Sequence, residues 1–466
     1  MSWIPFSLPF LYLKAVDAWL KSSDPNGPEE ADKILQNYER QYETRKNELS
    51  SVDIIYYHNV MTAISRKGGK KCFDKGQGTY LHQFAEKTEQ VLRRVEKLSR
   101  NDILKGPNTA TYNICIAAYS KCGDGRKAEQ LLNEMLKRDI KPDVISYNSV
   151  IDSWGRSGEK GSAARAESIL NAMKQYQIEP DIISYTGVVF AYTRSIEVDS
   201  ADKALKILES MEESGLSSNE FVYNAVLDAF AKSQQKDKVK KADALLSKMI
   251  SKGLANNVSF NALLNCYAKS AAPGAGSNAE SLLKRMEQSD EYKPDVISYT
   301  SVIDALTKSR DKNAAERAQK ILERMLKFAN EGDVTVKPNA VTYNTVINSW
   351  ASSGRPDAAK KAETLLQRME KIYENGECKK ARPNTISYTS VIDAYARSKS
   401  KNNALDAERV FKRMEEKYAG GNVNAKPNVH SFNTGEFSIS DVHKTFMKHS
   451  PSGLQFVLFD AVTCSD

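Results

Sequence analysis

Histidine and cysteine are scarce in this chain, whose 466 residues include five histidines and six cysteines. The cysteines form no C-x-x-C pair, so their spacing indicates neither a disulfide framework nor a zinc site, and a reducing compartment is the simplest interpretation. The H-x-E and C-x-x-C signature of zinc deaminases is absent, and the histidines form no recognisable catalytic or metal-binding arrangement. We therefore expect no catalytic residue, no metal and no cofactor, in a protein that is not an enzyme.

Long apolar runs are missing as well. No stretch approaches the ~18 apolar residues that a membrane-spanning helix needs, so we predict no membrane partner. The opening run from Trp3 to Leu13 is interrupted by Pro5 and Pro9 and lacks the pattern of a signal or transit peptide. Lys and Arg exceed Asp and Glu by 67 − 59 = 8, a mild surplus that permits a polyanionic partner without requiring one.

What the sequence does contain is an internal repeat with two parts. The first part is a tripeptide of the form Ser-Tyr-Asn or a close variant, which begins at Thr111, Ser146, Ser184, Val222, Ser259, Ser298, Thr342 and Ser387. The second part is Ala-x-x-(Leu/Ile/Val)-(Leu/Phe)-x-x-Met, which begins at Ala128, Ala166, Ala204, Ala242, Ala279, Ala318, Ala362 and Ala407. Successive alanines lie between 37 residues (242 to 279) and 45 residues (362 to 407) apart.

Each repeat predicts a pair of helices. In the repeat that starts at Val144, apolar residues recur at intervals of three and four from Tyr147 to Trp154 and again from Ala166 to Met173. A glycine-containing turn separates the two stretches, and Pro180-Asp181 closes the unit, where proline stops one helix and Asp can cap the next. One hairpin cannot bury both of its apolar faces, so neighbours must stack. We predict an all-α fold, an α-α superhelix or solenoid of helix-turn-helix repeats, with its longer units carrying extra residues in polar surface loops at 328–336 and 373–381.

The pattern varies along the chain. We predict a partial, degenerate repeat at 1–52, a divergent repeat at 53–108, eight tandem repeats at 109–428, and a truncated repeat stub with a non-repeat tail at 429–466.

Both ends of the chain suggest translated intron. Gly435-Glu436-Phe437 can be encoded by a stretch that contains a splice-donor sequence, and the residues from Phe6 to Leu11 can be encoded entirely by pyrimidines. We therefore expect an internal piece of a longer array, and transcript sequencing that finds a continuous frame across Gly435 would refute this.

The repeat resembles the pentatricopeptide repeat (PPR). The resemblance covers eight units from Thr109 to Asn428, although the units vary in length and only Thr109 to Asp143 has the family's usual length. Arrays of this family bind single-stranded RNA at one base per repeat. The resemblance implies an RNA-binding protein of the class without an appended catalytic domain, which acts in mitochondria or plastids on transcript stability, processing, splicing or translation.

Two positions in each repeat are candidates for base contact. The residue after the recurrent Tyr or Phe is always Asn or Thr, and the last residue of the unit is always Asp or Asn. The alternative is that the last residue only caps a helix and the Asn or Thr fills a polar slot between helices. The predicted base-contact pairs are Asn113 with Asp143, Asn148 with Asp181, Thr186 with Asn219, Asn224 with Asn256, Asn261 with Asp295, Thr300 with Asn339, Asn344 with Asn384, and Thr389 with Asn428.

Hydrogen-bond chemistry assigns a base to each pair. An Asp carboxylate only accepts, which suits N3–H of uracil or N1–H of guanine, whereas an Asn amide can donate to N3 of cytosine or N1 of adenine. The family resemblance adds that Thr goes with purines and Asn with pyrimidines, and that the amino end of the protein faces the 5′ end of the RNA. We predict the core site 5′-UUACUACA-3′, in which the fourth base, read by the unit that starts at Glu220, is C or another pyrimidine. The earlier pair, His58 with Asn108, fits no familiar combination and receives no base.

Two further rows accompany the pairs. The first is an apolar row, which by resemblance sandwiches bases, although these residues could instead pack inside at the start of the helix. Its members are Ile145, Ile183, Phe221, Val258, Ile297, Val341 and Ile386, with Ala110 and Val429 at its ends.

The second is a cationic row at the end of each first helix. A cation at this position in every repeat matches a phosphate backbone, although a cation is also favourable at any helix C-terminus. It comprises Arg66, Lys121, Arg156, Arg194, Lys232, Lys269, Lys308 and Arg397, and only Ser352 breaks it.

Two other functions compete with RNA binding. A tetratricopeptide-like scaffold that binds protein segments is also built from helix pairs, but its W-x-x-L-G-x-x-Y pattern is absent and it would not need the cationic row. The other is an enzyme whose catalytic domain lies outside this chain. For the RNA-binding prediction we expect no small-molecule substrate, and the sequence does not indicate protein partners.

Overall fold

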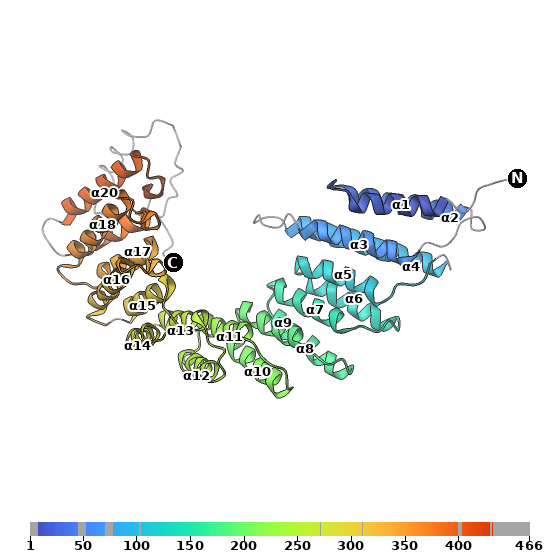
Figure 1. Cartoon of the computed structure of the whole chain (residues 1–466), viewed down its shortest axis with the longest axis horizontal. Helices are drawn as coiled ribbons and strands as arrows, with labels where there is room; N and C mark the ends of the chain where they lie inside the picture. The colour runs from blue at the N-terminus through green and yellow to red at the C-terminus, as the bar shows by residue number, and fades with distance from the viewer. Residues whose placement is uncertain are drawn as a thin grey trace, which may run out of the picture. The chain divides into compact units, whose positions relative to one another are not determined.

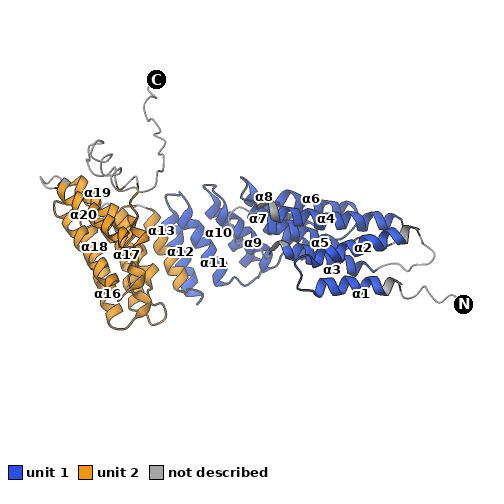
Figure 2. Ribbon diagram, turned by 90° about the horizontal axis from the view of Figure 1, so that it is seen from above, with its two compact units in different colours: residues 1–255 blue, residues 256–466 orange. Residues whose placement is uncertain are grey.

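The computed structural model describes residues 8–44, 53–69, 78–101, 104–270, 272–309, 311–398, 403–428 and 431. Over these residues the chain forms twenty α-helices and three short 3-10 helices, with no strand. The chain divides into two compact units, residues 1–255 (unit 1) and residues 256–466 (unit 2), shown in Figure 2. The predicted all-α fold of helix-turn-helix repeats is confirmed for the described residues. None of the helices in these ranges is long and apolar enough to span a membrane.

Unit 1 contains six helical hairpins in chain order (Figure 1). Their helices are α1 (Leu8–Lys21), α2 (Gly27–Thr44), α3 (Ile54–Gly69), α4 (Gly78–Arg100), α5 (Thr109–Cys122), α6 (Gly125–Lys137), α7 (Val144–Ser157), α8 (Ser162–Gln175), α9 (Ile182–Arg194), α10 (Ser200–Glu213), α11 (Glu220–Lys232) and α12 (Lys238–Ser251).

Unit 2 contains four further hairpins, the last three of which are followed by a 3-10 helix. Its elements are α13 (Asn257–Ser270), α14 (Ala275–Glu287), α15 (Val296–Lys308), α16 (Ala314–Asn330), η1 (Val334–Val336), α17 (Ala340–Ala351), α18 (Ala358–Glu374), η2 (Lys379–Ala381), α19 (Thr385–Arg397), α20 (Asn403–Ala419) and η3 (Val423–Ala425).

The first helices of successive repeats pack directly on one another. In unit 1 this row runs through α3, α5, α7, α9 and α11, and in unit 2 it runs through α13, α15, α17 and α19. From α4 onward, each second helix within a unit packs against the first helix of its own repeat and against that of the next. The first helices therefore form one layer in each unit, and their N-termini follow one another from repeat to repeat.

The recurrent tripeptide begins these first helices with a reciprocal cap. At α7 the backbone N–H of Ser146 donates to Asp143 Oδ1 at 2.9 Å, and the backbone N–H of Asp143 donates to Ser146 Oγ at 3.1 Å. Such a capping box satisfies two backbone donors, and losing the cap residue typically costs about 1 kcal/mol. The same box starts α5, α9, α15, α17 and α19.

The other recurrent residues form the core. The Tyr that follows the capping Ser and the Ala and Met of the second helix are almost completely buried, as Tyr147, Ala166 and Met173 illustrate. Close approach also restricts side-chain size, because a Cβ at Gly125 would lie 2.4 Å from the ring of Trp154. The tripeptide therefore supplies one capping residue and one core residue before its third residue, the candidate for base contact.

The extra residues of the longer units are not simply surface loops, as the sequence suggested. Helix α16 extends to Asn330, α18 extends to Glu374, and each is followed by a 3-10 helix. Val336 and Ala381, at the ends of these 3-10 helices, are buried. The prediction was wrong because a single apolar residue in a polar segment, such as Val336 or Ala381, can be buried and so hold that segment against a neighbouring hairpin.

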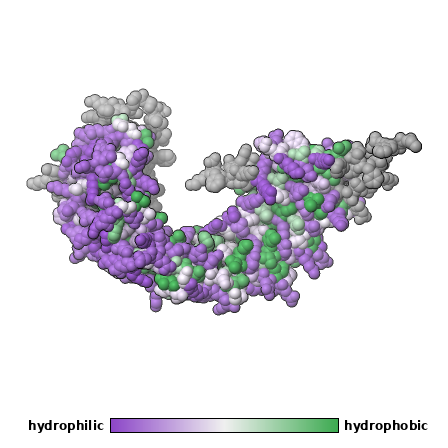
Figure 3. Space-filling model, viewed as in Figure 1, coloured by the Kyte–Doolittle hydropathy of each residue, from purple (hydrophilic) through white to green (hydrophobic). Residues whose placement is uncertain are grey.

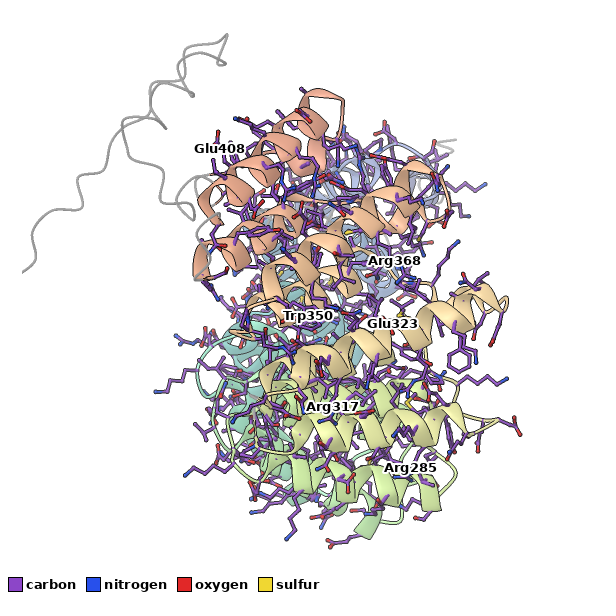
Figure 4. All side chains as sticks on the ribbon, turned by 90° about the vertical axis from the view of Figure 1, so that its left-hand side faces the viewer. Arg285, Arg317, Glu323, Trp350, Arg368 and Glu408 are labelled. Atoms are coloured by element: carbon purple, nitrogen blue, oxygen red, sulfur yellow. The ribbon has the colours of Figure 1, made fainter. Side chains whose placement is uncertain are left out.

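The second helices of unit 2 expose a mixed-charge surface, on which Figure 4 labels Arg285, Arg317, Glu323, Arg368 and Glu408. The Arg317 side chain on α16 donates to Glu280 on α14 at 2.8 Å, and Trp350 Nε1 on α17 donates to Gln319 on α16 at 3.0 Å. These contacts join one repeat to the next.

Candidate functional site

The junction between α7 and α9 shows how an Asn after the recurrent Tyr is held. Asn148 Nδ2 donates to Asp181 Oδ1 at 3.0 Å, and Asn148 Oδ1 accepts from Ser184 Oγ at 2.6 Å. The carboxylate cannot donate, so the amide nitrogen must face Asp181. These bonds use one amide hydrogen and one carboxylate oxygen, which leaves a donor and an acceptor next to each other.

The same arrangement recurs at three other junctions. Asn113 donates to Asp143 at 3.0 Å, and Asn344 donates to Asn384 at 3.1 Å. Asn261 donates more weakly to Asp295, with its nitrogen shared between the two carboxylate oxygens at 3.3 and 3.4 Å. In each case the Asn oxygen accepts from the capping Ser of the next helix, namely Ser146, Ser387 and Ser298. The structure therefore brings together four of the predicted base-contact pairs.

The Asn113–Asp143 and Asn148–Asp181 junctions hold an ionised carboxylate. Partial burial alone would raise the pKa of Asp181, but hydrogen bonds from the Ser184 backbone and the Asn148 and Ser184 side chains outweigh it. The pKa of Asp181 therefore lies below its usual value, and the same balance lowers the pKa of Asp143. Both carboxylates are ionised at neutral pH and can only accept hydrogen bonds.

A Thr after the recurrent Tyr behaves differently. The hydroxyls of Thr186, Thr300 and Thr389 donate to the backbone carbonyl four residues earlier, at 2.6, 2.7 and 2.7 Å. The hydroxyl hydrogen is then used within the helix, and the oxygen can accept a bond from elsewhere. The Asn paired with each Thr uses its Oδ1 to cap the next helix, so its Nδ2 is the group available to a ligand.

The capping role proposed as an alternative is present at every one of these junctions. Asn256 caps α13 in the same way, through the bond from Ser259 N to its Oδ1 at 3.1 Å. Most of the sixteen predicted residues are exposed or half-buried, but Asn344 is 9% exposed and Thr389 is 6% exposed. Capping uses one atom of each terminal side chain, so it does not exclude base contact, which stays a prediction for all sixteen.

The apolar row is exposed, and its seven members range from 60% to 67% in exposed fraction. The alternative that these residues pack inside is therefore wrong. Ile145 lies three residues before Asn148 on α7, so the two side chains share one face of the helix. Ala110 is exposed as well, whereas Val429 lies outside the described residues. Figure 3 shows apolar patches on a largely hydrophilic surface.

The cationic row is exposed but partly neutralised. Arg156, Lys232, Lys308 and Arg397 each form an ion pair with the Asp one turn earlier, namely Asp152, Asp228, Asp304 and Asp393. Lys121 instead donates to Ser65, and Arg194 donates to the Gly155 carbonyl. The sequence pattern therefore overstated the positive charge of this row, because it counted cations without their helix neighbours; Arg66 and Lys269 complete the row of predicted phosphate contacts.

Two groups of side chains were missed in the sequence. The first is the capping Ser or Thr, which holds the Asn of the preceding repeat in one orientation; its position three residues after the terminal Asp or Asn was a usable signal. The second is a basic group on and beside η2. Lys379, Lys380 and Arg382 line a pocket of about 540 Å³ together with Ala340, Asn384, Thr385, Ile386 and Asn424.

The described ranges contain no candidate metal site, because no group of three or more His, Cys, Asp or Glu side chains there could hold a metal ion. The repeats instead present a recurring set of three features: an apolar side chain, a hydrogen-bonding pair and a cation.

Comparisons with known families agree with the repeat pattern. Family models match most of the chain between residues 107 and 434: PPR repeat family at 107–156, pentacotripeptide-repeat region of PRORP at 156–252, pentatricopeptide repeat domain at 281–352 and 371–434, and PPR repeat at 341–372. No curated protein matches the chain.

Solved structures give a weaker likeness. The chain is similar to the pentatricopeptide repeat protein PPR10 in complex with an 18-nt psaJ RNA element, with 19% identity, a TM-score of 0.37, and coverage of 89% of this chain and 62% of that chain. It is also similar to PPR10 from maize, with 20% identity, a TM-score of 0.32, and coverage of 91% and 65%. The chain thus spans less than two thirds of the length of these proteins.

Proposed function

This chain belongs to the pentatricopeptide repeat family, and on that premise we propose that it binds single-stranded RNA with one base at each repeat junction. The observation that carries the proposal is the exposed apolar row beside the hydrogen-bonding pairs. An apolar side chain that is 60% exposed has surface available to the flat face of a base, as Ile145 and Ile297 do. The neighbouring pair then contacts the base edge.

The Asn–Asp pairs match uracil. The free amide hydrogen can donate to a base carbonyl, and the free carboxylate oxygen can accept the adjacent ring N–H. Guanine has the same pattern at O6 and N1–H, and the family preference of Asn for pyrimidines selects uracil. The repeats that begin at Thr109, Val144 and Asn257 therefore prefer U.

The Thr–Asn pairs match adenine. The Thr oxygen accepts from the exocyclic amine, and the Asn nitrogen donates to N1, which in adenine carries no hydrogen. The repeats that begin at Ile182, Val296 and Thr385 therefore prefer A.

The Asn344–Asn384 pair offers donors. Asn384 uses its Oδ1 to accept from Ser387 N at 3.1 Å and from Asn344 Nδ2 at 3.1 Å, so the Asn384 nitrogen and the second amide hydrogen of Asn344 are the groups available to a base. Cytosine has adjacent acceptors at N3 and O2, so the repeat that begins at Ala340 prefers C. The repeat that begins at Glu220 carries the same two residue types in sequence and is assigned C by that likeness. Together the eight repeats specify 5′-UUACUACA-3′.

The family also guides the biological role. We propose that the chain acts on transcripts of mitochondria or plastids, through their stability, processing, splicing or translation. Binding rather than catalysis is the proposed activity.

The test is a titration of the full chain with labelled RNA at one fixed salt concentration, because phosphate contacts make affinity salt-dependent. We expect UUACUACA to bind at least tenfold more tightly than a permuted octamer of the same composition, since a mismatched base leaves polar groups unpaired at about 1–3 kcal/mol each. Equal affinities would contradict the base assignments.

A double substitution sharpens this test. Thr186→Asn with Asn219→Asp recreates the Asn148–Asp181 pair, so the preferred third base should change from A to U. Thr345→Asn serves as a matched control, because Thr345 also donates to the carbonyl four residues earlier but lies one position beyond the junction residue. A protein-binding scaffold would give no change in base preference with either variant.

A further inference from the structure

The divergent repeat at 53–108 has the same junction geometry as the repeats that follow it. Helix α3 begins at Ile54, after Asp53 caps it through the bond from Ile55 N at 3.1 Å. Ile55 is 52% exposed, in the place that Ile145 occupies in α7. Tyr57 is buried, and Arg66 lies exposed in the last turn of the helix.

His58 takes the place of the junction Asn in this repeat. Its Nε2 lies 2.8 Å from Thr111 Oγ1, the capping hydroxyl of α5, in the place where Asn113 Oδ1 contacts Ser146 Oγ at the next junction. Asn108 caps α5 by accepting from Thr111 N at 3.1 Å through Oδ1. The Asn108 nitrogen therefore faces outward as a donor, and it makes no hydrogen bond within the described part of the chain.

The imidazole completes a pair that can contact a base. Burial lowers the pKa of His58 below its usual value, which keeps the ring neutral at pH 7. The Thr111 hydroxyl donates its hydrogen to Asn108 Oδ1 at 3.0 Å, so His58 must donate to Thr111 through Nε2–H. A neutral ring that carries its hydrogen on Nε2 keeps a lone pair on Nδ1, which can accept from an exocyclic amine. The outward groups are then an acceptor on His58 and a donor on Asn108.

We propose that His58 and Asn108 bind a ninth nucleotide directly 5′ of the octamer, and that they prefer a base with an exocyclic amine and an unprotonated ring nitrogen, adenine or cytosine. Asn108 decides the class, because its N–H would oppose the N3–H of uracil or the N1–H of guanine. The stacked contact of α3 with α5 places this pair in the same row as Asn113. The inference rests on the RNA binding proposed above.

The experiment titrates the full chain with the four nonamers 5′-NUUACUACA-3′. We expect the A and C nonamers to bind about tenfold more tightly than the U and G nonamers, the ratio that one unpaired donor produces. Asn108→Asp keeps the cap but replaces the donor with an acceptor, so it should reverse the order in favour of U and G. His58→Asn combined with Asn108→Asp recreates the Asn113–Asp143 pair and should favour U.

Controls separate this proposal from the one on which it rests. Asn313→Asp adds the same charge at the start of a second helix, α16, where the side chain makes no capping bond, so it should leave the order of the four nonamers unchanged. Four equal nonamer affinities, in a chain that still prefers the octamer over its permutation, would overturn the ninth site alone. Loss of the octamer preference itself would overturn both proposals.

Discussion

Helices α7 and α15 allow a close comparison between unit 1 and unit 2. Their first nine residues are Val-Ile-Ser-Tyr-Asn-Ser-Val-Ile-Asp and Val-Ile-Ser-Tyr-Thr-Ser-Val-Ile-Asp, which differ only at Asn148 and Thr300. Both helices start with a capping box on Asp, and both end with an exposed Asp–cation pair. The single difference changes what the junction presents to a ligand.

Asn148 and Thr300 also connect their repeats differently. The Asn148 amide joins α7 to the cap of α9, whereas the Thr300 hydroxyl donates to Val296 in its own helix and lies 2.9 Å from the Thr342 hydroxyl. An Asn at the junction therefore does two things: it stabilises the contact between neighbouring repeats, and it fixes the direction of its amide donor. A Thr junction contributes less between repeats but supplies an acceptor. The choice of base and the strength of the junction are thus linked in this fold.

The largest effect is expected from Asn148→Asp. A second carboxylate would then face Asp181 Oδ1, with the amide bond lost, so we expect a destabilisation of about 2 kcal/mol at neutral pH. Asn148→Thr introduces the side chain of Thr300 without adding a charge, so it should cost less than about 1 kcal/mol. Urea denaturation of the full chain, followed by circular dichroism, measures both. Equal unfolding midpoints for Asn148→Asp and the wild type would show that this amide does not join the repeats.

An intermediate effect depends on pH. The pKa values of Asp143 and Asp181 are lowered in the folded chain, so their stabilisation is present above the usual value of 3.8 and is lost as the pH falls through the lowered values. The variant with both Asp143→Asn and Asp181→Asn keeps the caps and should lose less stability on acidification. Thermal melting across the acid range, compared with the wild type, checks this. If acidification lowered the melting temperature of the wild type and of the variant by the same amount, this role of the two carboxylates would be contradicted.

The smallest effect concerns the buried tyrosines of the same two helices. Tyr299 Oη donates to Glu287 at 2.7 Å, whereas Tyr147 Oη has no hydrogen-bond partner among the residues that the structure describes. Burial raises the pKa of Tyr147 to about 12. Tyr147→Phe removes an unsatisfied hydroxyl, so we expect a change between zero and about 1 kcal/mol of added stability. Tyr299→Phe should instead lose about 1 kcal/mol. Denaturation midpoints that move in the same direction for both variants would refute the difference.

The sequence explains why these two tyrosines differ. Glu287 lies eight residues after the recurrent Ala279, and the corresponding position after Ala128 is Leu136. The same position holds Glu212 and Glu370, which accept from Tyr223 and Tyr388. It holds Leu326 in the repeat before Tyr343, whose hydroxyl likewise has no hydrogen-bond partner within the described ranges. In these repeats, one residue on the second helix thus determines whether the buried tyrosine hydroxyl of the next repeat has a hydrogen-bond acceptor.

Local order is what the sequence determined by itself. Periodicity, capping residues and turn glycines act over three to eight residues, so the helix pairs, the caps and the core Tyr, Ala and Met could be predicted from their spacing. The extra residues of the longer units were misjudged because Val336 and Ala381 are buried by neighbouring hairpins, which a local pattern does not reveal.

Only the tertiary structure decided how the junction side chains are used. Whether Ile145 is buried or exposed depends on where the next hairpin lies, and whether Asn148 meets Asp181 depends on contact between residues 33 positions apart. The same holds for His58, whose partner Thr111 lies 53 positions away. Exposure and hydrogen-bond pairing are properties of surfaces from two different repeats, so they are settled only when the hairpins stack.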